Sequence, residues 1–431
     1  MKMIELLAPA GDFDKLKYAF AYGADAVYAG VPRFSLRTRE NEFNNRTIEE
    51  AVEIAHNLNK KIYLTLNIFP HNRKIDSFAE TLKWMATLRP DAIIVSDPGV
   101  IAMSQTYCPA IPLHLSTQAN TVNWASVKFW KSQGVRRIIL SRELSIEEIT
   151  EIRQRVPDIE LESFVHGAIC VSYSGRCLLS NYFTHRDPNQ GTCANSCRWD
   201  YKIYGQKDFQ PEQEYKTLQG NYFLEETDRP GQYLPIEEDA HGTYIMNSRD
   251  LCAISLLQKL KAAGVDSFKI EGRNKSVYYV SVITRAYRQA IDSIARGASF
   301  DKRLEHEMFA VANRGYITGF LERNPLNLGE NTTSSHSGNQ THQFSAIVKE
   351  VNQETGSARV AVRNRFQTGD RMELMSPLET IPFMIENIVT LSGKAVDTAH
   401  GGGEDVWINI PARVDTFSLI RKPLSESITT E

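Results

Sequence analysis

Short apolar runs alternate with amphipathic segments of helical length along the first 300 or so residues of the chain. The helical segments, such as 13–24 and 47–60, have the three- to four-residue apolar spacing of a surface helix. We expect Thr47 to be the N-cap of the second helix, because Glu50 three residues later completes the capping-box pattern. Eight apolar runs are typical of buried strands: 4–10, 26–30, 62–69, 92–97, 113–119, 137–143, 160–168 and 267–273.

This alternation predicts an α/β fold, a (β/α)8 barrel of the TIM type over 1–325, with an open doubly wound sheet as the alternative. The seventh and eighth runs are separated by 98 residues, 169–266, where a crossover needs only a few dozen. Because the loops that follow barrel strands carry function, we expect this insertion to bear part of the functional site.

A smaller all-β region is predicted after the barrel. Residues 326–342 are rich in Asn, Ser, Thr and Gly and are typical of a linker. Short alternating runs follow at 344–351, 358–366, 371–377, 382–389, 407–410 and 417–422. They predict a C-terminal β-barrel or sandwich over 343–431.

Composition narrows the class of protein without deciding its function. Hydrophobic residues make up 42% and charged residues 23%, as in an ordinary globular protein. The formal net charge of -3 gives no overall attraction for nucleic acid, so RNA binding would need a local basic patch. The sequence shows neither a signal peptide nor an apolar run of about 18 residues, and we expect a cytoplasmic protein without a membrane partner.

Cysteines are concentrated in the insertion. In a reducing cytoplasm, clustered thiols favour metal binding or catalysis over disulfides. Only Cys193 and Cys197 have the spacing of a zinc knuckle, whereas iron–sulfur clusters accept thiolates from loops of varied spacing. We expect an iron–sulfur cluster of the 4Fe-4S type on Cys170, Cys177, Cys193 and Cys252, with Cys197 as the alternate ligand. Zinc, and structural or catalytic thiols, stay open as alternatives.

Polar side chains recur where the predicted strands end, which is where barrel enzymes place their working groups. Arg142 and Arg273 could clamp the carboxylates of a small dicarboxylate through bidentate hydrogen bonds. Asn67 and Gln118 are further candidates for substrate binding. Alternatively, the neighbouring pairs Arg142 with Glu143 and Glu271 with Arg273 form structural ion pairs.

His166, Glu162 and Glu271 are the candidate catalytic residues. His166 could shuttle a proton near neutral pH, and strand alternation would place Glu162 on the same side. The alternative is a hydrogen-bonded histidine and a core network. For RNA contact we expect the loop 34–46, which offers Arg37 and Arg39 with Phe34 and Phe43, next to Arg33 and Arg46.

Five stretches resemble the blocks of the collagenase-like peptidase family U32: ESFVHGAICVSYSGRCLLS (162–180), GTCANSCRWDY (191–201), STQANTVNW (116–124), ILSRELSIEEI (139–149) and FKIEGRNKSVYYV (268–280). The similarity covers the whole chain and is greatest to the tRNA hydroxylation protein P branch. That resemblance implies oxygen-independent conversion of the tRNA wobble uridine to 5-hydroxyuridine, an iron–sulfur cluster, and prephenate as the oxygen donor. It also implies tRNA and an electron-donor protein as partners.

Two other classes of function remain as alternatives. A cysteine peptidase needs a thiolate beside an oriented histidine, and His166 lies four residues before Cys170. The H-E-x-x-H and G-x-S-x-G motifs of other peptidases are absent from the sequence. The second alternative is a noncatalytic scaffold in which a metal only holds the insertion in place.

Overall fold

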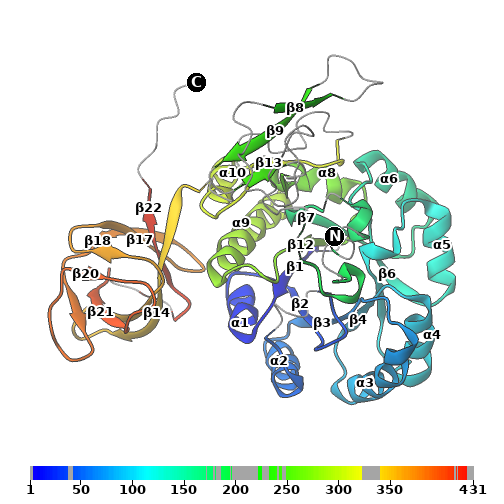
Figure 1. Cartoon of the computed structure of the whole chain (residues 1–431), viewed down its shortest axis with the longest axis horizontal. Helices are drawn as coiled ribbons and strands as arrows, with labels where there is room; N and C mark the ends of the chain where they lie inside the picture. Colours follow the sequence, from blue (N-terminus) through cyan, green and yellow to red (C-terminus); the bar gives the residue numbers. More distant parts are fainter. Residues whose placement is uncertain are drawn as a thin grey trace, which may run out of the picture.

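Eight parallel strands close into a barrel in the computed structural model of the chain (Figure 1). The strands are β1 (Glu5–Ala10), β2 (Ala26–Gly30), β3 (Lys61–Leu66), β4 (Ala92–Val95), β5 (Leu113–Leu115), β6 (Val135–Ile139), β7 (Glu160–Ala168) and β12 (Ser267–Ile270). The barrel closes because β12 pairs in parallel with both β1 and β7. The predicted (β/α)8 class is confirmed, and each of the eight predicted runs overlaps one of these strands, although β3 and β6 begin one and two residues before their predicted runs.

The structure describes residues 3–36, 42–170, 172–177, 180, 186–194, 196, 249–322, 340–411, 414 and 416–424, and the backbone of 222–225, 233–239 and 242–244.

Helices surround the barrel (Figure 1). They are α1 (Phe13–Ala21), α2 (Asn45–Asn57), α3 (Ile75–Leu88), α4 (Pro98–Tyr107), α5 (Trp124–Ser132), α6 (Ile146–Arg155), α8 (Leu257–Ala262), α9 (Val277–Ala295) and α10 (Arg303–Met308). Short 3-10 turns include η2 (Asn72–Lys74), η3 (Thr117–Ala119), η4 (Tyr173–Gly175), η5 (Pro188–Gln190) and η8 (Ile254–Leu256). None of the described helices has the length and hydrophobicity that crossing a membrane requires.

The predicted cap of α2 was wrong by three residues. Asn44 caps this helix, because its side chain accepts a hydrogen bond from the Thr47 backbone N–H at 3.0 Å. Thr47 lies inside the first turn, where its hydroxyl accepts from the Asn44 backbone N–H at 2.9 Å. The pair forms a capping box, and asparagine is among the strongest N-cap residues.

A network of charged side chains fills the inside of the barrel near the start of the strands. Arg137 of β6 contacts Glu5 of β1 at 2.6 Å and Glu162 of β7 at 2.9 Å. Lys269 of β12 contacts the same Glu162 at 2.8 Å. We call these four residues the charge layer. Because they come from four strands and are nearly inaccessible to solvent, they join the barrel wall across its interior.

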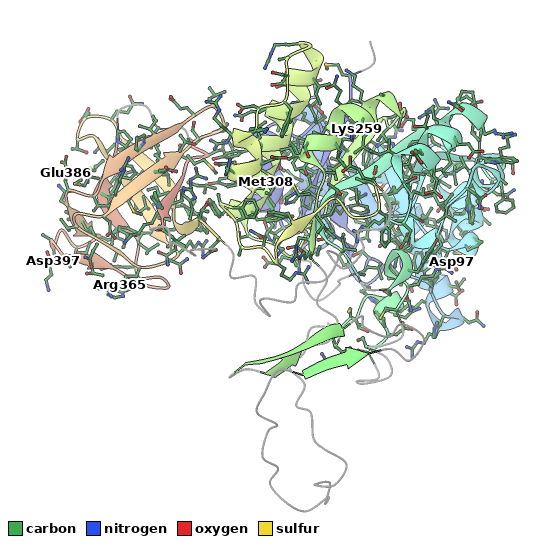
Figure 2. The ribbon with its side chains drawn as sticks, turned by 90° about the horizontal axis from the view of Figure 1, so that it is seen from above. Asp97, Lys259, Met308, Arg365, Glu386 and Asp397 are labelled. Carbon is green, nitrogen blue, oxygen red and sulfur yellow. The ribbon has the colours of Figure 1, made fainter. Side chains whose placement is uncertain are left out.

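The insertion after β7 extends the sheet outward. β11 (Asp250–Cys252) pairs antiparallel with β7, and β13 (Tyr316–Ile317) pairs with β11. β8 (Tyr222–Glu225), β9 (Tyr233–Asp239) and β10 (Gly242–Tyr244) form a separate antiparallel ribbon. Figure 2 shows this ribbon on the side of the barrel where Asp97, at the exit of β4, lies. This ribbon therefore lies on the side of the barrel at which the strands finish.

An antiparallel all-β region with its own hydrophobic core follows the barrel. Its strands are β14 (His342–Asn352), β15 (Ser357–Val362), β16 (Phe366–Gln367), β17 (Arg371–Met375), β18 (Thr380–Met384), β19 (Ile388–Thr390), β20 (Thr398–Ala399), β21 (Val406–Asn409) and β22 (Leu419–Pro423). The predicted linker, 326–342, lies almost wholly outside the described residues.

The β region packs against α1, α9 and α10 (Figure 1). The Tyr22 hydroxyl lies 3.0 Å from the carbonyl oxygen of Met375. Arg421, which is 4% exposed, contacts Glu307 of α10 at 2.7 Å, and Arg285 of α9 contacts the same carboxylate at 3.0 Å. Buried charged contacts of this kind hold the two parts of the chain in one orientation.

Candidate functional site

The ends of β3 and β5 carry a pair of hydrogen-bonded amides. The side-chain amide of Asn67 donates to the side-chain oxygen of Gln118 at 3.1 Å, and the Ser96 hydroxyl donates to the Asn67 carbonyl at 3.2 Å. The structure thus brings these two predicted residues together at the end of the barrel where the strands finish. We call this end the mouth.

Three cationic side chains lie over two aromatic rings inside the mouth. The Arg142 guanidinium is 4.1 Å from the Phe164 ring centre. The Lys269 ammonium is 5.5 Å from that ring and 4.4 Å from the Tyr28 ring, and the Arg273 guanidinium is 5.8 Å from the Tyr28 ring. These five residues are the mouth layer. The two predicted arginines therefore belong to one cationic surface that has an apolar base.

The arginine forks are held mainly by uncharged groups. Arg142 donates to the Ala168 carbonyl at 3.1 Å, and Arg273 donates to the Thr65 hydroxyl at 3.0 Å and to the Leu36 carbonyl at 2.6 Å. The expected alternative of an Arg142–Glu143 ion pair does not form among the described residues. Arg142 keeps its full charge, which suits it to an anionic ligand.

Lys269 joins the charge layer to the mouth layer. Burial lowers the pKa of Lys269, and the positive charges of Arg137 and Arg273 lower it further, while Glu162 opposes them. A lysine within a predicted buried strand was a sequence signal for a functional or structural charge inside the barrel. Strand alternation places Lys269 on the same side as Ser267, whose hydroxyl donates to Glu5 inside the barrel. Lys269 was not among the predicted residues, and neither were Tyr28 and Phe164.

The described residues between 170 and 196, here called the thiol segment, lie against three loops of the mouth. Ser174 donates to both carboxylate oxygens of Glu143, through its backbone N–H at 2.6 Å and its hydroxyl at 2.5 Å. Arg176 donates to the Gln118 carbonyl at 2.8 Å. The Phe69 N–H donates to the Asn189 carbonyl at 3.1 Å. These contacts run from the exit of β6 to those of β5 and β3, so the thiol segment covers part of the mouth.

The described cysteines of this segment lie at the mouth and form no disulfide with one another. Cys170 and Cys193 are exposed, and Cys177 is half-buried. Cys252 lies on β11 opposite His166 of β7. In the described part of the chain, no group of three or more His, Cys, Asp or Glu is arranged to hold a metal ion. The alternate ligand, Cys197, lies outside that part.

Three residues around the mouth have left-handed backbone conformations without being glycine. Arg33 has φ 70°, Asn120 has φ 53° and Ser174 has φ 44°. Such conformations cost about 1–3 kcal/mol each and collect at functional sites. Each of the three lies on a different loop of the mouth, but Asn59 (φ 53°) and Arg89 (φ 54°), which precede β3 and β4 at the opposite end, have the same conformation, so this feature alone does not distinguish the two ends of the barrel.

The expectation that Glu162 and His166 share one side of β7 was wrong. The pairing of β7 with β12 shifts register after Phe164, where Lys269 pairs with Phe164 but Ile270 pairs with His166. This bulge reverses the alternation. Glu162 consequently points into the charge layer, whereas His166 contacts Tyr287 of α9, with 3.3 Å between the imidazole Nδ1 and the hydroxyl.

His166 is poorly suited to shuttling protons near neutral pH. Burial lowers the pKa of His166 to about 3, since the ring lies among Tyr279, Tyr287 and Tyr316. Burial also raises the pKa of the neighbouring Cys252 thiol to about 11. A cysteine peptidase needs a thiolate beside a basic imidazole, so this pair has the opposite properties.

Glu271, the third candidate catalytic residue, lies directly after β12. Its backbone N–H donates to the His166 carbonyl at 2.9 Å, and its carbonyl accepts from the Tyr279 hydroxyl at 2.8 Å. A side chain at Gly167 would come within 2.7 Å of the Glu271 carbonyl oxygen. The glycine is therefore required by the close approach of the two strand ends.

The predicted aromatic groups for RNA contact are not available. Phe34 is 5% and Phe43 is 4% exposed, and the Phe34 ring packs on Phe78 with 4.4 Å between centroids. Both rings belong to the hydrophobic core, and Phe34 joins the loop to α3. Arg37 and Arg39 lie outside the described residues.

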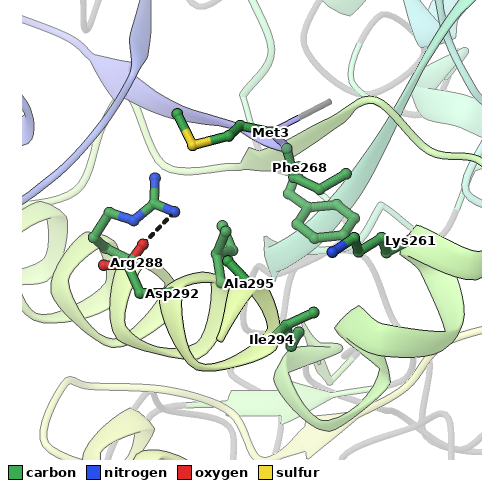
Figure 3. Close-up of a pocket in the computed structure, with 9 residues that line it drawn as sticks. Met3, Lys261, Phe268, Arg288, Asp292, Ile294 and Ala295 are labelled. Atoms are coloured by element: carbon green, nitrogen blue, oxygen red, sulfur yellow. Dashed lines mark ion pairs between the residues drawn. The ribbon is translucent and has the colours of Figure 1, made fainter. Parts of the chain in front are cut away.

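A cavity of about 220 Å³ lies at the opposite end of the barrel (Figure 3). It is lined largely by apolar side chains between β12, α8 and α9, and Arg288 at its edge is paired with Asp292 at 2.7 Å. None of the predicted site residues lines this cavity.

Comparison with known proteins identifies the family. The sequence model for "Peptidase family U32" matches residues 11–331, which is most of the chain. This chain belongs to peptidase family U32. The model for the "Peptidase family U32 C-terminal domain" matches 340–421, the β region. The resemblance stated from the sequence is confirmed across the barrel and the β region.

Relatives within family U32 include RNA-modifying proteins. The "tRNA hydroxylation protein P" of Escherichia coli (strain K12) is 46% identical, with 99% of this chain and 98% of the relative covered. The "23S rRNA 5-hydroxycytidine C2501 synthase" of the same organism is 35% identical over 68% of this chain and 40% of its own. A solved structure described as "The Structure of the U32 Peptidase Mk0906" is 15% identical, with a TM-score of 0.39, and the match covers 63% of this chain and 94% of that one.

Proposed function

We propose that this protein hydroxylates RNA at the barrel mouth, with the wobble uridine of tRNA as substrate and 5-hydroxyuridine as product. The support for hydroxylation comes from full-length similarity to a tRNA hydroxylation protein and partial similarity to an rRNA hydroxycytidine synthase. The structural observation that carries the proposal is the mouth layer, where Arg142 and Arg273 face the same opening as the thiol segment.

The mouth layer supports an anionic co-substrate with a ring. Arg142 and Arg273 offer forked donors for two carboxylates, and Phe164 and Tyr28 offer apolar faces. Prephenate, a cyclic dicarboxylate, has this combination of groups and is our proposed oxygen donor. In this proposal the arginines bind and orient the co-substrate, and the thiol segment limits the access of water.

The thiols fit an iron–sulfur cluster by their chemistry. Cys170, Cys177 and Cys193 form no disulfide, the first and third of them are exposed, and Cys252 lies beside the end of β7. We propose that these four, or Cys197 in place of one of them, hold the cluster. Their sulfur atoms would have to come closer together when it binds, as is common for metal sites. A bound cluster would supply electron transfer or Lewis acidity next to the mouth layer.

The peptidase alternative finds less support. Its support is the word peptidase in the name of the family. However, the described histidine nearest in sequence to Cys170 is His166, whose ring is buried among tyrosines. Casein cleavage that is abolished by Cys177→Ser would favour the peptidase.

Complementation tests the role of the mouth arginines. In a bacterial strain whose tRNA lacks 5-hydroxyuridine, expression of the wild-type chain should restore the nucleoside, measured by mass spectrometry of digested tRNA. Arg142→Ala should lower the yield roughly 10- to 100-fold, because a charge-assisted hydrogen bond contributes about 1.5–3 kcal/mol.

Arg142→Lys is the matched control, because it keeps the charge but loses the fork, and it should retain an intermediate yield. If Arg142→Ala restores the nucleoside as well as the wild type, the proposed role of the mouth layer is wrong. If the wild type fails to restore it while the protein is abundant, the proposed substrate is wrong.

A further inference from the structure

Basic side chains gather on one side of the mouth, where three loops meet. Arg33 follows β2, Arg73 and Lys74 form part of η2 after β3, and Arg176 lies in the thiol segment. We call these four residues the rim patch. Arg33, Arg73 and Arg176 are exposed, and Lys74 is half-buried.

Hydrogen bonds bring the three loops together. The Val31 N–H donates to the Thr65 carbonyl at 3.3 Å, and the Ile68 N–H donates to the Phe34 carbonyl at 3.4 Å, so the loop bearing Arg33 runs beside the end of β3. The Lys74 ammonium donates to the Gln190 side chain at 3.1 Å, which connects η2 to the thiol segment.

Arg176 completes the rim patch from above an aromatic ring. Its guanidinium lies 4.9 Å from the Phe69 ring centre, and its Nε donates to the Gln118 carbonyl at 2.8 Å. The side chain is thus fixed between the exits of β3 and β5, at the edge of the opening that leads to the mouth layer.

The rim patch has an excess of positive charge. In the described part of the chain none of its four cations forms an ion pair with a carboxylate. Burial lowers the pKa of Lys74, and Arg73 and Arg33 lower it further, which shows that the charges of these residues act on one another. Asp187 is the acid that opposes them. The chain as a whole has a net charge of -3, so this local excess does not follow from composition.

We propose that the rim patch binds phosphates of the RNA strand on one side of the nucleotide that enters the mouth. Three exposed guanidinium groups on fixed loops suit phosphate oxygens, and a looped RNA strand must pass the edge of the opening to present a base to the mouth layer. This inference rests on the proposed function, because it concerns the same RNA. It replaces the buried Phe34 and Phe43 as the expected point of RNA contact.

Charge reversal tests the rim patch. Arg33→Glu/Arg73→Glu alters two exposed side chains that make no hydrogen bond among the described residues. The matched control is Arg363→Glu/Arg365→Glu, which makes the same change in charge at two exposed arginines of the β region. Binding of purified protein to unmodified tRNA is measured by filter retention over a range of salt concentrations.

The rim variant should bind tRNA at least about tenfold more weakly than the wild type. The slope of the logarithm of its association constant against the logarithm of salt concentration should be shallower by roughly 0.7–0.9 for each phosphate that is no longer neutralised. The control should bind as the wild type does. Both purified variants should keep the wild-type thermal midpoint. If the double rim variant does not fold, Arg73→Gln alone, which should weaken binding several-fold, gives the same test.

Different failures have different meanings. If the rim variant binds tRNA as tightly as the wild type, the rim-patch proposal is wrong. It is also wrong if the control loses as much affinity as the rim variant. Both results leave the proposed function intact. A wild-type protein that does not bind tRNA overturns the proposed function itself. If the rim variant binds tRNA normally but loses hydroxylation in cells, the patch serves another protein, and the inference is wrong.

Discussion

Replacing Arg137 with methionine is expected to lower the free energy of unfolding by about 3–5 kcal/mol, because it leaves buried carboxylates without their shared partner. The Arg137 side chain is 4% exposed and contacts Glu5, Glu160 and Glu162 at 2.6, 2.8 and 2.9 Å. Lys269 remains to balance Glu162, so the main cost arises at Glu5. Urea unfolding followed by circular dichroism measures the effect.

Arg136→Met is the matched control on the same strand. Arg136 is exposed, and its replacement should change stability by less than about 0.5 kcal/mol. Equal stability of the two variants would contradict the view that the charge layer holds the barrel wall together.

The charge layer also predicts the direction of the pH dependence of stability. Burial alone would raise the pKa of Glu5, but Arg137 and Lys61 outweigh this effect and lower it from 4.5 to about 2. Because the folded-state pKa is below the unfolded value, the stabilisation is present above about pH 4.5 and is lost as the pH falls toward 2. In Arg137→Met the folded-state pKa of Glu5 should rise toward or above 4.5, because burial is then opposed by fewer positive charges, so stability should fall less between pH 4.5 and 2 than it does in the wild type.

Cys177→Ser is expected to remove most of the iron and acid-labile sulfide from anaerobically purified protein, together with the broad absorbance near 400 nm that we expect of the cluster. The reason is that a serine hydroxyl would replace one of the four proposed thiolate ligands. Hydroxylation of tRNA should be lost with the cluster. Metal and sulfide assays on the same preparation measure both components.

Cys108→Ala is the control for this experiment. Cys108 is 2% exposed at the end of α4 and belongs to the hydrophobic core, so its variant should keep the wild-type iron content. Comparison of Cys193→Ser with Cys197→Ser decides between the two candidate ligands. A colourless wild-type protein with tightly bound zinc would rule out the cluster.

The strands could be predicted because their apolar runs are separated by amphipathic helices. Their number favoured a barrel over an open sheet, but only the pairing of β12 with both β1 and β7 shows that the barrel closes. Which side chains face the interior could not be predicted reliably. Both faces of a parallel strand are buried, so alternation alone does not separate inside from outside. The bulge after Phe164 then reversed the alternation for His166, and nothing in the local sequence marks it.

At the site, Arg142, Arg273, Asn67 and Gln118 were placed at the mouth by the rule that working groups follow barrel strands. The contacts of Glu143 with Ser174 and of Phe69 with Asn189 join residues far apart in the chain. No periodicity or spacing reports such contacts, and of the rim patch, which depends on them, only Arg33 was predicted to contact RNA.

The most direct test is the mass of the wobble nucleoside in unmodified tRNA after incubation with anaerobically purified protein, a reductant and prephenate. We predict that the uridine becomes heavier by one oxygen atom with the wild-type chain, and that the conversion falls roughly 10- to 100-fold with Arg142→Ala. An unchanged uridine with wild-type protein that contains its full iron and sulfide would contradict the proposal that this mouth hydroxylates tRNA.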